Sequence, residues 1–136
     1  MQRIITGALA LFLSSGAAFA QSPYTFRPEA LALSTGVKTA TATAGAATLN
    51  KPAGKVTTEA LVTAALSNYT LTLTNSTIAA TDNVFVSLAY GTATTGNPVV
   101  SRVTPGAGSV VITVRNVDPT VALNGTIVVS FFGLKQ

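Results

Sequence analysis

The stretch NYTLTLTNSTIAATDNVFVS, residues 68–87, reads as a strand, a tight connection and a second strand. Tyr69, Leu71 and Leu73 share one parity and alternate with threonines, which is typical of a strand with one face on a core and the other in water. The polar residues that follow interrupt this alternation, and a second apolar run begins at Val84 and ends at Tyr90. This stretch therefore predicts two strands joined by a turn-forming connection.

Further short strands are expected on both sides of this pair. Their ranges, separated by Gly, Pro, Asn and Asp, are 47–50, 55–58, 99–104, 109–116 and 126–134. The last strand carries apolar residues on both faces, so we expect a central strand or one covered at an interface. The segment 59–66 is expected to be a turn or loop with Leu61 and Leu66 in the core, or a single helical turn.

These patterns predict an all-β fold, an antiparallel β-sandwich of jelly-roll or Ig-like type with six to eight short strands. We expect the sandwich domain to span residues 45–136. The preceding segment, 21–44, is expected to be an N-terminal arm or a set of weak strands, because its alternating Thr and Ala specify the register poorly. Within it, Tyr24 and Phe26 lie between two prolines; the segment is either a mobile arm or one that docks on a neighbouring subunit.

The first twenty residues have the layout of a secretory signal peptide. Arg3 is followed by an apolar run from Ile4 to Leu13, and Ala18-Phe19-Ala20 precedes the expected cleavage point at Gln21. This run is shorter than the roughly 20 residues of a membrane-spanning helix. We therefore expect an exported chain, periplasmic, at the cell surface or extracellular, with no membrane span after cleavage.

The composition excludes several classes of chemistry. The chain has no Cys and no His, which removes disulfides, thiolate and imidazole metal ligands and the usual Ser–His and Cys–His pairs. Without Arg3, seven basic residues face four acidic ones, and the basic residues are scattered along the sequence. A nucleic-acid-binding surface would cluster them, so no nucleic-acid partner is expected.

The four carboxylates, Glu29, Glu59, Asp82 and Asp118, are the remaining acid–base groups. Each lies beside a turn or loop signal, and they are far apart in the sequence. We expect Asp82 and Asp118 to accept hydrogen bonds from backbone N–H groups in turns. No catalytic residue, no metal site and no cofactor is predicted, and the chain is expected not to be an enzyme.

Four segments occur in an order that resembles a known family: LNKPAGKVT from Leu49, LTLTNSTIAATD from Leu71, GSVVITVRN from Gly108 and IVVSFF from Ile127. They are similar to segments of small β-sandwich domains in tailed-phage virion proteins, of the fibre or decoration kind, and in prophage-like bacterial proteins. The resemblance covers residues 45–136. It implies a structural, self-associating module with no catalytic residues to carry over. The signal peptide departs from this pattern, because virion proteins assemble in the cytoplasm.

The function predicted from the sequence is an exported, non-enzymatic structural or surface-interaction subunit of bacterial type. It would form a homo-oligomer through its sandwich, with a trimer as one expected form. The alternative is a module that binds a glycan or another surface polymer through the loops 91–98 and 116–125. A hydrolase using two of the carboxylates is the third reading.

Overall fold

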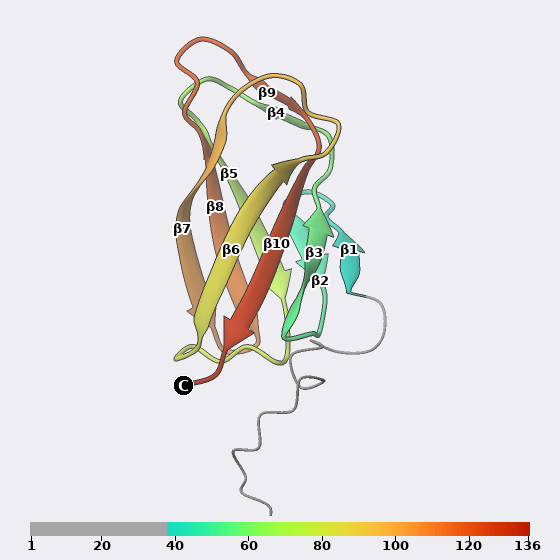
Figure 1. Ribbon diagram of the computed structural model, residues 1–136, viewed down its shortest axis with the longest axis vertical. Helices are drawn as coiled ribbons and strands as arrows, with labels where there is room; N and C mark the ends of the chain where they lie inside the picture. The colour runs from blue at the N-terminus through green and yellow to red at the C-terminus, as the bar shows by residue number, and fades with distance from the viewer. Residues whose placement is uncertain (1–37) are drawn as a thin grey trace, which may run out of the picture.

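The computed structural model describes residues 38–136, and within this range the chain is all-β, with ten strands and no helix (Figure 1). The expected signal peptide and most of the expected arm, including Tyr24 and Phe26, lie outside the described residues. The described part contains no helix long and apolar enough to cross a membrane.

The strands form two four-stranded sheets and a small two-stranded one. Sheet A has the order β1-β3-β10-β6, and its strands are β1 (Thr39–Thr41), β3 (Ala53–Thr57), β10 (Ile127–Leu134) and β6 (Asn83–Tyr90). Sheet B has the order β2-β5-β8-β7, and its strands are β2 (Ala46–Thr48), β5 (Asn68–Thr74), β8 (Ser109–Asn116) and β7 (Pro98–Gly106). β4 (Leu61–Thr63) pairs with β9 (Leu123–Gly125) at the end of the molecule where β6 finishes (Figure 1).

The core lies between sheets A and B and follows the alternation seen in the sequence. Sheet B contributes Leu71 and Leu73 from β5 and Val110, Ile112 and Val114 from β8, all fully buried. Sheet A contributes Val56, Val129 and Phe131, while the threonines of β5 face water. Ile78, in the connection after β5, is buried as expected, and Tyr69 packs against the edge of the core. At roughly 25 cal/mol per Å² of apolar surface, this burial is the main stabilising term of the fold.

Strand pairing corrects the antiparallel prediction. β1 runs parallel to β3, and β2 runs parallel to β5, while the other pairs are antiparallel. The chain leaves β1 in sheet A, turns at Ala44 and Gly45, and enters β2 in sheet B. One short crossing between the layers thus supplies an edge strand to each sheet, and an edge strand placed in this way need not form a hairpin with its neighbour.

Three local predictions are also corrected. The described residues form ten strands instead of six to eight, because β1, β4 and β9, for which no separate strand was predicted, each pair over three residues. The segment 59–66 contains β4; Leu61 is buried as expected, but Leu66 is 53% exposed and has a φ of 56°. The predicted loop 116–125 ends in β9, where Gly125 pairs with Leu61.

The prediction for the last strand is confirmed. β10 lies between β3 and β6 and pairs with both along most of its length. Its inward side chains join the core, and its outward side chains lie in the middle of the exposed face of sheet A. This face carries the candidate site.

Candidate functional site

The candidate site is the outer face of sheet A near the end where β10 finishes. Residues 84, 86 and 88 of β6 point inward, so Phe85, Ser87 and Ala89 point outward. On β10 the outward positions are Val128, Ser130, Phe132 and Leu134, on the parity opposite to the buried Val129 and Phe131. The register pairs Phe85 with Phe132 and Ser87 with Ser130, which brings residues from distant parts of the sequence side by side.

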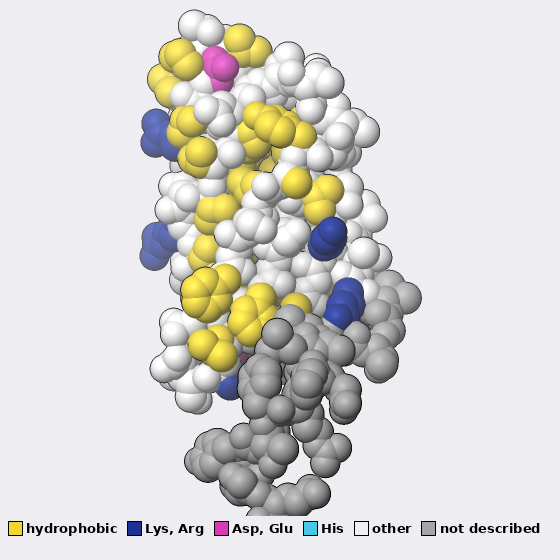
Figure 2. Space-filling view, viewed as in Figure 1, with side chains coloured by type: hydrophobic (Ala, Val, Ile, Leu, Met, Phe, Trp, Pro, Cys, Tyr) yellow, Lys and Arg dark blue, Asp and Glu magenta, His cyan; other side chains and the backbone are white. Residues whose placement is uncertain are grey.

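Phe85 and Phe132 stack on each other, with ring centroids 6.3 Å apart and an angle of 22° between the planes. Phe85 is 59% exposed and Leu134 is 46% exposed, so this cluster faces solvent. We call Phe85, Phe132 and Leu134 the aromatic strip. Figure 2 shows hydrophobic side chains gathered over this part of the face.

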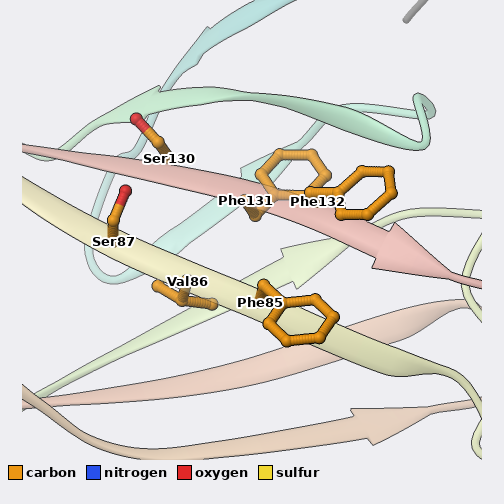
Figure 3. A pocket seen from close by; sticks show the side chains of 6 residues that line it. All are labelled: Phe85, Val86, Ser87, Ser130, Phe131 and Phe132. Carbon is orange, nitrogen blue, oxygen red and sulfur yellow. The ribbon is translucent and has the colours of Figure 1, made fainter. Parts of the chain in front are cut away.

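Two shallow hollows adjoin the strip. The first, about 240 Å³, lies between β6 and β10, and Figure 3 shows Phe85 and Phe132 on adjacent strands beside Ser87 and Ser130. The second, about 510 Å³, extends across β10 to β3 and β1. It is lined by Lys38, Thr39, Ala53, Gly54, Lys55, Ser130, Phe131 and Phe132. Its lining is therefore mainly small and aromatic groups, with two lysines.

The outer face of sheet B has a different character. On β5 the outward residues are Thr70, Thr72 and Thr74, and the neighbouring positions of β8 include Thr113 and Arg115. Hydroxyl groups on a strand face form hydrogen bonds with water, so their exposure costs little free energy. The apolar surface of an exposed phenylalanine pair forms no such bonds, so its exposure to water is unfavourable. The outer face of sheet A therefore carries two adjacent aromatic rings, whereas sheet B carries mainly hydroxyl groups, with Val99 of β7 38% exposed among them.

The two loops predicted for polymer binding, 91–98 and 116–125, lie together at the end of the molecule opposite to the aromatic strip. Asn97 donates its N–H to the side-chain oxygen of Asn116 over 2.9 Å, and the Thr95 hydroxyl donates to the Ala122 carbonyl over 2.9 Å. The Asn116 amide, fully buried, donates to the carbonyls of Thr63, Ala64 and Val121. These polar groups hold the loops to each other, and both hollows described above lie elsewhere.

Asp82 and Asp118 lie at opposite ends of the molecule, as the directions of β6 and β8 require. Both accept backbone N–H groups, as predicted: Asp82 from Ala79 over 2.8 Å, and Asp118 from Val121 over 2.7 Å. Asp82 also pairs with Lys135 at 2.6 Å, a contact that the sequence did not indicate. The Lys135 ammonium, followed by the Ala79 N–H, lowers the pKa of Asp82; the N–H groups of Thr120 and Val121 lower the pKa of Asp118.

Glu59 performs a third structural task. It accepts the Gly45 N–H over 2.8 Å and the Tyr69 hydroxyl over 3.1 Å, and so ties the β1–β2 crossing to β5. Burial, with the nearby Glu59 carboxylate, raises the pKa of the Tyr69 hydroxyl. Among the described residues, no three of the His, Cys, Asp and Glu side chains gather into a group that could hold a metal ion.

The sequence reasoning did not single out Phe85, the most exposed aromatic residue of the strip. Its parity in β6 could have revealed it, because Val84, Val86 and Leu88 occupy the inward positions and leave Phe85 on the other face. Phe132 was noticed only as part of a strand with two apolar faces. Comparison of the chain with known protein families, with curated proteins and with solved structures found no match.

Proposed function

We propose that this chain is an exported, non-enzymatic structural or surface-interaction subunit that associates with copies of itself through the outer face of sheet A. The observation that carries the proposal is the stacked, solvent-exposed pair Phe85 and Phe132. Burying a phenylalanine side chain contributes about 1.5–3 kcal/mol to the free energy of association. Two such rings with Leu134 therefore supply a substantial part of the free energy of a contact between subunits.

The carboxylates of the described residues also support a non-enzymatic role. The carboxylates Glu59, Asp82 and Asp118 serve backbone and neighbouring side chains, and each does so in a different part of the fold. We propose that the two four-stranded sheets form a sandwich of the jelly-roll or Ig-like type in which one edge pair of each sheet is parallel. The resemblance of residues 45–136 to phage-type virion domains also points to a structural module, here exported to the periplasm or cell surface of a bacterium.

The experiment is sedimentation of the exported chain over a range of concentrations, compared with two variants. We expect the natural chain to form a closed oligomer, such as a trimer, and Phe85→Thr to weaken association about tenfold or more with an unchanged circular dichroism spectrum. Val62→Thr is the matched control, because Val62 is 81% exposed at the opposite end of the molecule. A natural chain that stays monomeric at all concentrations would overturn the proposal.

The adjacent loops 91–98 and 116–125 support a second candidate function, binding of a glycan or other surface polymer. Tyr90, beside the first loop, is 53% exposed, and its hydroxyl donates to the Gly96 carbonyl, which fixes an aromatic ring of the kind that stacks on sugars. A glycan array with the natural chain and Tyr90→Ala distinguishes this role from self-association.

A further inference from the structure

We propose that the N-terminal segment 21–37 of one copy occupies the larger hollow on sheet A of a neighbouring copy. This inference rests on the proposed self-association and names the part of the chain that makes the contact. Three independent features carry it: the place where the described chain begins, the length of the preceding segment, and the match in chemistry between segment and hollow.

The described chain begins at the hollow. Lys38 and Thr39 both line it, together with Ala53 and Gly54 of β3 and Phe132 of β10. The Lys38 carbonyl accepts the Lys55 N–H over 2.8 Å, so this entry point is fixed to sheet A. A segment tethered here is held beside the hollow of its own copy, and it is equally close to the hollow of a neighbouring copy where two copies meet at this end.

The direction of β1 favours a neighbouring copy over the same one. Because β1 runs parallel to β3, the chain enters sheet A at the end where β3 begins and continues along it. The preceding residues must reverse direction to cover their own sheet, but not to reach another copy. Seventeen residues, 21–37, span up to about 56 Å when extended at about 3.3 Å per residue. The eight residues of β10 span about 26 Å by the same measure, so the segment is long enough to bridge two copies.

The chemistry of the segment complements the hollow. Tyr24 and Phe26 lie two residues apart, so both side chains point to the same side of an extended segment, while Leu31 and Leu33 point together to the other side. On the outward side, the lining of the hollow offers Phe132 and Ala53, which pair across β10 and β3. Glu29 is opposite in charge to Lys38 and Lys55, which also line the hollow, whereas Arg27 has the same charge as these lysines. Extended peptides bind sheet surfaces through side-chain anchors two residues apart, the spacing of Tyr24 and Phe26.

Absence of cysteine allows a direct test by disulfide trapping in the full exported chain. A Phe26→Cys chain is mixed with a Ser130→Cys chain of different isotopic mass, and the mixture is oxidised mildly. We expect mixed dimers at least ten times as abundant as with Thr72→Cys, which places the thiol on the outer face of sheet B. Equal trapping at the two positions would overturn the proposal.

A second pair of variants tests the same contact through charge. We expect Lys55→Glu to weaken association severalfold, and the double variant Lys55→Glu with Glu29→Lys to restore most of it. The two proposals fail in different ways. If Phe85→Thr dissociates the oligomer but the double variant Tyr24→Ser with Phe26→Ser does not, the proposed self-association stands and the proposed role of the segment is wrong. A chain that carries both Phe26→Cys and Ser130→Cys provides a further test. If it forms only the disulfide within one chain and none between chains, the segment does not reach a neighbouring copy.

Discussion

Asn116 illustrates how one buried side chain organises a whole end of the molecule. Its amide group donates to three carbonyls, and its oxygen accepts the N–H groups of Asn97 and Asp118 over 2.9 and 3.2 Å. We expect Asn116→Ala to lower the free energy of unfolding by about 3 kcal/mol, because several buried backbone groups lose their partner. Urea denaturation measures this, with the exposed Asn124→Ala as the control. A loss equal to that of the control would contradict the role.

Asp82 and Asp118 determine how the fold responds to acid. The pKa of each is lower in the folded chain than its ordinary value of 3.8, so the unfolded chain binds protons more tightly. This contribution to stability is therefore complete above about pH 5 and is lost progressively as the pH falls through the ordinary value towards the lowered ones. We expect the urea concentration at the unfolding midpoint to decrease as the pH is lowered from 5 to 2. The decrease should be smaller in the double variant Asp82→Asn with Asp118→Asn. An unchanged pH dependence in the double variant would exclude these carboxylates as the cause.

At the scale of elements, the β7–β8 hairpin depends on one glycine. Gly108 has a φ of 77°, and a Cβ there would meet no atom within 4 Å, so backbone conformation alone requires glycine. We expect Gly108→Ala to destabilise the fold by about 1–2 kcal/mol. Gly106→Ala is the control, since its Cβ would meet the movable Ser109 hydroxyl at 3.2 Å and the Ser109 carbonyl oxygen at 3.7 Å, the second an ordinary van der Waals contact. Thermal unfolding compares the two, and equal losses would show that the left-handed conformation is not the reason for glycine.

The longer strands were predictable from the sequence, and the short ones were not. β5, β6, β8 and β10 agree with their predicted ranges to within about one residue, because their alternating apolar side chains mark both the strand and its inward face. β2 overlaps the strand predicted at 47–50, whereas β1 consists of Thr and Ala, which favour neither face, so that only pairing with β3 defines it. β4 and β9 form where the buried Leu61 and Leu123 close the end of the core. The sequence does not show that these two residues lie close together, so it does not predict this pair of strands.

At the scale of the whole molecule, the two outer faces differ in what they can do. Sheet B presents threonines, and sheet A presents the aromatic strip with hollows on both sides of β10. Self-association through sheet A therefore predicts a change in assembly state for Phe85→Thr without a change in fold. The position of the chain entry beside the larger hollow extends this to a segment that links one copy to the next.

The sequence by itself determined the all-β class, the inward residues of the long strands and the turn roles of Asn75, Asp82 and Asp118. These follow from local rules: the parity of a strand and the hydrogen bonds that a short polar side chain makes to its neighbours in the chain. Asn75, for instance, accepts the N–H of Thr77, two residues further along the chain.

Only the tertiary structure decided the parallel edge pairs, the contact of Asp82 with Lys135 and the meeting of Phe85 with Phe132. The partners in each case lie far apart in the sequence, and the order of strands that buries the core selects them. Parity shows which way a side chain points, but not which strand lies beside it. The candidate site depends on this second property, because a single exposed phenylalanine is ordinary, whereas the pairing of β6 with β10 stacks two of them on the outer face of sheet A.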